Sequence, residues 1–398
     1  MNRLTVLLTC ILACALVATS CSSGPQVSAA ELEQVVRRDG VPFDVQSIPD
    51  EVLDRLASHR VVVVGEIHFL REHRELVAEL LRSLHERGFR QFLFEWTQVA
   101  DWLLADFVND GGLVPGWAPP PSIGGEMIAA IRDFNRTLPE DERIQVHAID
   151  VTLADYGGGQ SFLASLGALS PLLPDPGPLS ALLQGPYDTH ENQEAQLQTL
   201  QAELESGRSA LVASWGEQWY DTVAELVEVE LTSVSIRAIR ESNYDKSVRL
   251  REDAIKQLVD RRLQKVPHGT LINVGSTHAQ KERLYGTDIE WLGDYLVHKS
   301  PVADGSVIVL NVSAAHIAAV PGSGNPDYTL SASPENELNR VVSSTWADQT
   351  VFLPLDDPLF EEGRVPISSD GTIYKGALQR HFDAFILLPF AQRVPSTD

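Results

Sequence analysis

Two short apolar runs in the sequence end in the same pattern, a glycine followed three residues later by a histidine. The first, VVVVGEIH, places Gly65 before His68, and the second, LINVGSTH, places Gly275 before His278. Histidine is the side chain best suited to exchange a proton near neutral pH. We interpret the two runs as strands that each turn on the glycine and present a histidine to one site.

Three carboxylates occupy comparable positions. Glu66 lies between the first glycine and its histidine, Glu95 ends the run RQFLFEW, and Asp150 ends IQVHAID. Because Phe94 and Trp96 flank Glu95, we expect partial desolvation to raise its pKa and suit it to proton transfer. Each residue also has a structural alternative: a loop or N-cap role for a histidine, an arginine partner for Glu95, and a cap for Asp150.

A strongly charged segment, REHR, follows the first run and begins the next helix. Charge on a first helical turn is usually solvated, so most of this segment receives no role. His73 is retained as a candidate for substrate or ligand binding, together with Asp150.

The elements that must position these residues alternate between strand and helix. The segment REHRELVAELLRSLHERG has leucines on one helical face and a terminal glycine, and it separates two strand-like runs. This βαβ pattern predicts parallel strands, whose carboxyl ends meet at one edge where α/β sheets bind ligands. We predict an α/β fold with a central, mostly parallel sheet flanked by helices. It would form one domain over residues 46–398, with a mainly helical insert or lid at about 155–265.

The N-terminus has the pattern of an export signal. Arg3 precedes a short apolar stretch at residues 4–17, and the small residues Ala-Thr-Ser then precede Cys21. This order resembles a bacterial lipoprotein signal, with 1–20 removed, Cys21 lipidated and 21–45 forming a tether that contains a short helix at AAELEQVVRRD. Ordinary signal-peptidase cleavage is the alternative. We expect an exported protein anchored to a membrane by lipid, facing the periplasm or the cell surface.

The net charge and the positions of the cysteines exclude several classes of partner and of site chemistry. The formal net charge is -24, which disfavours nucleic acid and anionic lipid headgroups as partners. The three cysteines, Cys10, Cys14 and Cys21, all lie within or beside the signal. The mature domain therefore has no disulfide, cysteine metal ligand or cysteine nucleophile.

The run from VVVVGEIH to FLFEW resembles the opening of the erythromycin esterase/ChaN-like superfamily, in which a strand ends in Gly-Glu followed by histidine and a second strand ends in glutamate. EMIAAIRDFNR, QVHAID, LINVGSTHAQ, EWLGDYL and HFDAFILLP resemble later family segments in the same order, over most of residues 55–390. The Glu-to-His spacing is one residue shorter than in erythromycin esterases and closer to ChaN-like lipoproteins, which bind haem. The paired Gly-x-x-His motifs are also similar to those of the metal-dependent TIKI/TraB proteins.

The resemblance implies a hydrolase in which His68 activates water, Glu66 and Glu95 orient it or manage protons, and His278 stabilises the oxyanion. The sequence contains no Gly-x-Ser-x-Gly elbow, so direct water attack on an ester or amide of a small-molecule or peptide substrate is favoured. Two alternatives stay open. One is a zinc or manganese site formed by His68, Glu95 and His278, as in a TIKI-like protease. The other is haem binding with His73 or Tyr187 as the axial ligand.

Overall fold

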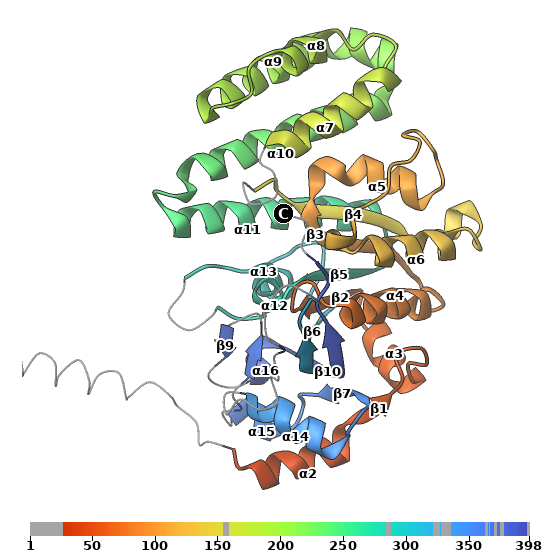
Figure 1. Ribbon diagram of the computed structural model, residues 1–398, viewed down its shortest axis with the longest axis vertical. Helices are drawn as coiled ribbons and strands as arrows, with labels where there is room; N and C mark the ends of the chain where they lie inside the picture. The colour runs from red at the N-terminus through yellow and green to blue at the C-terminus, as the bar shows by residue number, and fades with distance from the viewer. Residues whose placement is uncertain are drawn as a thin grey trace, which may run out of the picture.

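The computed structural model in Figure 1 describes residues 27–153, 159–283, 288–320, 327, 336–362, 365, 367–369, 372–374 and 378–395. The predicted signal peptide and the predicted lipidation site at Cys21 lie outside these residues. No helix in the described part of the chain is both long enough and apolar enough to cross a bilayer.

An eight-stranded sheet organises the fold, in the order β1-β7-β10-β6-β2-β5-β3-β4. Its strands are β1 Val41–Phe43, β2 Val61–Glu66, β3 Phe89–Thr97, β4 Gln145–Asp150, β5 Gly269–Gly275, β6 Val307–Ala318, β7 Thr350–Pro354 and β10 Ala384–Gln392. Neighbours from β10 to β4 are parallel, whereas β7 pairs antiparallel with β1 and β10. The short strands β8 Ile367–Ser369 and β9 Thr372–Tyr374 form a separate antiparallel pair. The predicted α/β class, with a central and mostly parallel sheet, is confirmed.

Alternate side chains of the central strands supply two apolar layers, one on each face of the sheet. In β2, Val61 and Val63 belong to one layer and Val62 and Val64 to the other. The first layer packs against α2 Ala29–Asp39, α11 Tyr244–Lys265, α13 Leu292–His298 and α14 Glu337–Thr345. The second packs against α3 Asp50–Ala57, α4 Arg71–His85 and α6 Gly125–Asn135. Because both faces are covered, β2 is a continuous valine run.

The predicted tether is wrong for residues 29–43. The expected helix at 29–39 forms as α2, but it buries Leu32, Val35 and Val36 in the first core layer. β1 then adds an antiparallel strand to β7. The apolar spacing within AAELEQVV is that of a core-facing helix, so this segment is part of the folded domain.

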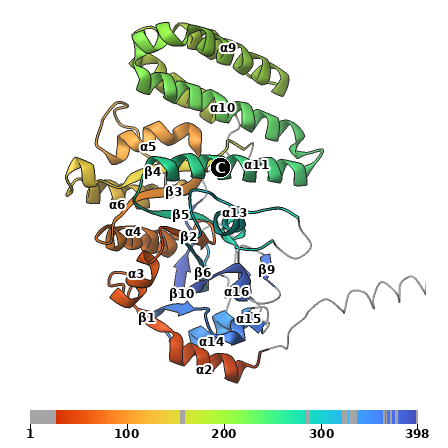
Figure 2. The same ribbon diagram turned by 180° about the vertical axis from the view of Figure 1, so that it is seen from behind.

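Between β4 and β5 the regular structure of the described residues is helical. It comprises α7 Gly159–Leu169, η5 Ser170–Leu172, α8 Gly177–Gln184, α9 His190–Trp215, α10 Glu217–Arg240 and α11. Helices α7 to α10 share a third apolar core with α5 Asp101–Val108 and stand beyond the β4 edge of the sheet (Figures 1 and 2). Helix α11 returns to pack on a sheet face, and Val229 and Ile236 of α10 join the same core layer. The insert therefore extends the sheet's edge, and we call α7 to α10 the helical cap.

Short helical segments complete the described chain: α12 Ser276–Ala279, α15 Pro358–Glu362, α16 Leu378–His381, η1 Gln98–Ala100, η2 Pro121–Ile123 and η3 Glu140–Glu142.

Candidate functional site

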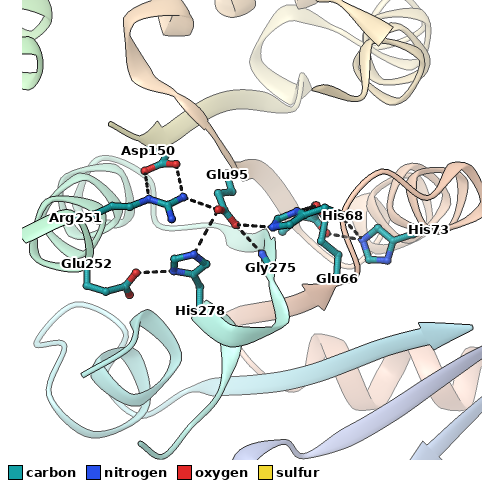
Figure 3. Close-up of polar contacts among 10 residues, drawn as sticks. Glu66, His68, His73, Glu95, Asp150, Arg251, Glu252, Gly275 and His278 are labelled. Atoms are coloured by element: carbon teal, nitrogen blue, oxygen red, sulfur yellow. Dashed lines mark hydrogen bonds and ion pairs between the residues drawn. The ribbon is translucent and has the colours of Figure 1, made fainter. Parts of the chain in front are cut away.

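The carboxyl ends of β2, β5, β3 and β4 lie side by side and carry the candidate residues (Figure 3). Glu66 and Asp150 are the last residues of β2 and β4, and the β3–β4 pairing shifts register around Glu95, near the end of β3. Such an irregularity re-aims a side chain at a strand end. His68 follows β2 by two residues, and His278 lies in α12 directly after β5. The structure places these five residues at one edge of the sheet.

The two motif glycines provide space and not an unusual backbone turn. Neither has a positive φ, and that of Gly275 is -52°. A Cβ on Gly275 would lie 2.8 Å from Nε2 of His68, and one on Gly65 would lie 3.0 Å from Cβ of Ala279. The expectation that the chain turns on these glycines holds for Gly275, which ends β5 and caps α12, but not for Gly65, which lies within β2. They are required because neighbouring groups approach the backbone closely.

Glu66 holds the two histidines that follow it. Its Oε1 lies 2.8 Å from Nδ1 of His68, and its Oε2 lies 3.1 Å from Nε2 of His73. The Asn273 amide donates to the same Oε2 at 2.8 Å, while its Oδ1 lies 2.8 Å from Nε2 of His73. Burial opposes ionisation of Glu66, but the hydrogen bonds from His68 and then His73 lower its pKa well below the ordinary value. Glu66 is thus a fixed carboxylate that orients His68.

His73 supports the site from behind. Its side chain is 1% exposed and is enclosed by Glu66 and Asn273. It is absent from the lining of the cleft described below. The structure therefore places His73 where it positions Glu66, and not where it could contact a substrate as predicted.

Glu95 lies at the centre of the site. Its Oε2 accepts a 2.7 Å hydrogen bond from the Gly275 N–H and lies 4.0 Å from Nε2 of His68. Its Oε1 accepts from Arg251 at 2.6 Å and lies 3.4 Å from Nε2 of His278. Burial does act to raise its pKa, but His278 and then Arg251 and His68 lower it well below the ordinary value. The predicted raised pKa is wrong because the positive charges of His278 and Arg251 outweigh the effect of burial on Glu95.

Arg251, on α11, links two of the strand ends. Its Nε and Nη2 donate to the two oxygens of Asp150 at 2.9 and 2.6 Å, and Nη2 also donates to Glu95. Asp150 further accepts from the N–H of Val151 at 2.7 Å. Although Asp150 borders the cleft, its carboxylate is committed to positioning Arg251, and Arg251 in turn fixes Glu95.

His278 is enclosed between two carboxylates. Its Nδ1 lies 2.5 Å from Oε1 of the fully buried Glu252, and Nε2 faces Glu95. The indole of Trp291 meets its ring edge-on at 5.5 Å. Burial acts to lower the pKa of His278, but Glu252 and then Glu95 raise it to about 10. His278 is therefore an imidazolium at neutral pH.

Sequence reasoning missed Arg251 and Glu252. Both lie on α11, one and two turns before the buried Ile255 and Leu258. Charged residues at positions that continue an apolar stripe face the core instead of solvent. The spacing in RLREDAIKQL therefore indicates that Arg251 and Glu252 face the core. Our prediction places this segment in the helical insert or lid and gives its charges no role.

The site opens into a small cleft of about 60 Å³. Glu66, His68 and Glu95 line its polar side, and Phe94, Trp96 and Met127 are among its apolar lining. A volume of this size holds one or two water molecules.

The C-terminal strand holds the loop that carries His68. Phe69 lies in the left-handed region, with φ 65°, which is unfavourable for a bulky side chain. Its carbonyl accepts a 2.8 Å hydrogen bond from the Val394 N–H, and Glu72 accepts one of 2.6 Å from the Gln392 N–H. These bonds to β10 and the residues after it fix the loop in its strained conformation.

The geometry fits neither of the predicted cofactors. Among the described residues, no group of three or more histidine, cysteine or acidic side chains is arranged to hold a metal ion. His278 in particular has a carboxylate facing each ring nitrogen. The haem ligands considered above are also unsuited: His73 is buried within its network, and Tyr187, which borders the cap, donates to Glu230 at 3.0 Å.

No protein-family model matches the chain, and no curated protein matches its sequence. Solved structures do match its fold. A mutant of the erythromycin esterase EreC in its open conformation has a TM-score of 0.63 and 18% identity, covering 87% of this chain and 95% of that chain. A protein from Bacillus cereus has a TM-score of 0.66 and 13% identity, covering 94% and 100%. A succinoglycan biosynthesis protein has a TM-score of 0.63 and 12% identity, with the same coverage.

A structure of ChaN from Campylobacter jejuni with cofacial haem also aligns, but its TM-score of 0.29 is too low to bear on this chain. The other three likenesses, at 12–18% identity, establish the fold and leave the activity to the site's chemistry. The resemblance that the sequence suggested is confirmed at this level: the chain has the erythromycin esterase fold.

Proposed function

We propose that the chain is a hydrolase that adds water directly to the carbonyl carbon of a small ester, or less readily an amide. One observation carries this proposal. His68 and His278 approach the two oxygens of a single carboxylate, Glu95, at 4.0 and 3.4 Å, beside a cleft of water size. One histidine is oriented as a base, and the other is held as a cation.

His68 is the general base. Because the ionised Glu66 accepts the Nδ1 proton, the lone pair of His68 lies on Nε2; this tautomer follows from the hydrogen-bond network. The 4.0 Å separation between Nε2 and Glu95 exceeds a hydrogen bond, but one water bonded to both groups spans about 4–5 Å. Glu95 would hold this water while His68 removes its proton.

His278 stabilises the negative charge. Attack by water converts the ester carbonyl into a tetrahedral oxyanion. His278 does not line the cleft and faces a carboxylate at each ring nitrogen, so its positive charge acts on the oxyanion from behind Glu95 and not through a direct hydrogen bond. Collapse of the oxyanion breaks the carbon–oxygen bond, and the leaving alkoxide takes the proton that His68 removed from water. No protein nucleophile is needed, in keeping with the lack of a serine elbow.

The first test compares variants of the two site histidines with a variant of a histidine at the other end of β5. His278→Gln and His68→Gln are assayed on p-nitrophenyl and lactone esters, with His268→Gln as the control, because His268 is exposed and precedes the amino end of β5. We expect kcat to fall about 10²–10⁴-fold in the two site variants and to stay unchanged in the control. Equal turnover in all three variants and the parent would overturn the assignment.

We propose in addition that the chain is exported and lipid-anchored through Cys21. The support is the sequence of residues 1–21 alone. Cys21→Ser should release the protein from the membrane fraction and abolish the lipid-modified N-terminal peptide in mass spectrometry, whereas Cys14→Ser should do neither. An unmodified Cys21 in the mature protein would contradict the proposal.

A further inference from the structure

A second cleft lies on the outer side of the sheet, away from the candidate active site. It has a volume of about 520 Å³ and is bordered by η1, α5, β4, α10 and α11. β4 is an edge strand of the sheet, and α5 and α10 lie beyond it (Figure 2). The cleft is lined by residues of these elements and not by the carboxyl ends of the strands. The two clefts share no lining residue.

The floor of this cleft is a fixed ionic network. Asp101 accepts hydrogen bonds from Arg262 at 3.0 Å and from the Ala148 N–H at 2.9 Å, and it lies 3.1 Å from Nδ1 of His147. Arg262 also donates to Glu225 at 2.9 Å. Burial opposes ionisation of Asp101, but His147 and then Arg262 lower its pKa. The network is rigid and charged at neutral pH.

Two polar atoms at this floor lack a partner. Gln98 and Arg262 both line the cleft and are 2% and 5% exposed, yet Oε1 of Gln98 and Nε of Arg262 have no hydrogen bond in the described structure. Buried polar groups are nearly always satisfied, so each of these two atoms calls for an explanation. A donor from a ligand or an ordered water would satisfy Gln98, and an acceptor would satisfy Arg262, after a small shift of the side chains that cover them.

One wall of the cleft is aromatic. The indoles of Trp102 and Trp219 meet edge-to-face with centroids 6.0 Å apart, and Trp102 is fixed by a 2.8 Å hydrogen bond from Nε1 to Ser165. Leu113, which is 42% exposed, also borders the cleft. Aromatic faces with a few placed polar groups are the usual composition of a small-molecule site.

The charges at the cleft select the ligand class. Asp101, Asp221 and Glu225 disfavour an anion, whereas Arg262 and Lys265 disfavour a cation. A hydroxyl group is both donor and acceptor, so the hydroxyls of a neutral ligand can pair with the amide oxygen of Gln98 or with the guanidinium of Arg262. The apolar face of a sugar ring can pack on an indole while its hydroxyls reach such partners.

The cleft also continues into a second depression, so it offers room for more than one sugar ring. Asp221, Glu225 and Lys265 border a neighbouring depression of about 370 Å³ that is lined by Tyr220. We propose that this surface between α5 and α10 is a binding site for a neutral oligosaccharide. This site is separate from the proposed hydrolase centre and does not depend on it.

The test measures saccharide binding to the full chain by saturation-transfer NMR. Cellotetraose, maltotetraose, mannotetraose and chitotetraose are titrated to about 10 mM, with tetramethylammonium and acetate as charged probes. We expect at least one tetrasaccharide to bind, and Trp219→Ala and Gln98→Met each to weaken it about tenfold or more. Tyr244→Ala, which removes a 62% exposed aromatic outside the cleft, should not weaken it.

The melting temperature and circular dichroism spectrum should be unchanged in all three variants, which shows that they are folded. If Trp219→Ala does not fold, the near-isosteric Gln98→Met decides alone. The proposal is overturned if no tetrasaccharide binds, if only a charged probe binds, or if Gln98→Met binds as tightly as the parent.

Discussion

The two site histidines differ because their surroundings differ. His68 has one carboxylate at Nδ1 and a side chain that is 30% exposed at the cleft. His278 is 7% exposed and has a carboxylate at each ring nitrogen. Two histidines in such different surroundings can take different roles, with His68 as the base and His278 as the cation.

Glu252→Gln tests the cationic role of His278. A raised folded-state pKa contributes stability that is full below the unfolded value of about 6.5 and is lost as pH rises through about 10. Removing the Glu252 charge should lower the pKa of His278 by about 1–3 units and move the alkaline limb of the pH–rate profile down by a similar amount.

The unfolding free energy of Glu252→Gln should fall by about 3 kcal/mol at neutral pH and depend less on pH between 7 and 10. Asp253→Asn, which alters the neighbouring carboxylate, 61% exposed on the same helix, should change neither quantity. An unshifted alkaline limb in Glu252→Gln would show that His278 is not the titrating cation.

Gly275→Ala tests the close approach of the His68 ring to the backbone of Gly275. The new methyl group would lie 2.8 Å from Nε2 of His68 and should push the ring away from Glu95. We expect kcat to fall about 100-fold, because small displacements of catalytic groups are costly, with little change in melting temperature. Gly167→Ala on α7, where a Cβ meets nothing within 4 Å, is the matched control and should retain full activity.

At the scale of elements, the strand ends and the apolar face of α4 were predictable, whereas the face that α11 turns to the site was not. The runs ending at Glu66, Glu95 and Asp150 identified the parallel strands and their common edge, because buried strands are continuous apolar runs bounded by polar residues. The role of α11 escaped prediction because its partners lie far away in sequence: Arg251 is 101 residues from Asp150 and 156 from Glu95. The spacing in RLREDAIKQL indicates that these charges face the core, but it does not indicate which distant residues they pair with.

Arg251→Lys tests the contribution of α11 to the site. A lysine can replace the charge but not the forked contact to Asp150 and Glu95, so Glu95 should lose its fixed position. We expect kcat to fall about 10–100-fold and the unfolding free energy by about 1–3 kcal/mol. Arg249→Lys, an exposed residue on the same helix that pairs with Asp288, should behave like the parent. Full activity in Arg251→Lys would mean that the charge alone suffices.

At the scale of the molecule, the helical cap is joined to the sheet directly beside the site. The main-chain N–H and carbonyl of Thr152, two residues after Asp150, bond to Ser233 at 3.0 Å and to Arg237 at 2.8 Å, both on α10. Arg237 also pairs with Glu230 at 2.7 Å, and their side chains are 3% and 0% exposed. The cap and the strand end that holds Arg251 therefore share one buried junction.

Arg237→Ala tests this junction. It leaves Glu230 buried and unpaired, which should cost about 3–5 kcal/mol, and hydrogen exchange should rise in α9 and α10 more than in β2 and β5. Replacing both partners with apolar residues, as in Arg237→Met with Glu230→Leu, should recover most of that stability but not the bond to Thr152.

The double variant separates stability from positioning. If the Thr152 contact transmits order to Asp150, the stable double variant keeps a lowered kcat, whereas restored turnover would confine the junction to a structural role.

Arg261→Ala removes a half-exposed pair with Glu228 and should cost less than about 1 kcal/mol. Equal exchange in the cap and the sheet of Arg237→Ala would show that the two unfold as one unit.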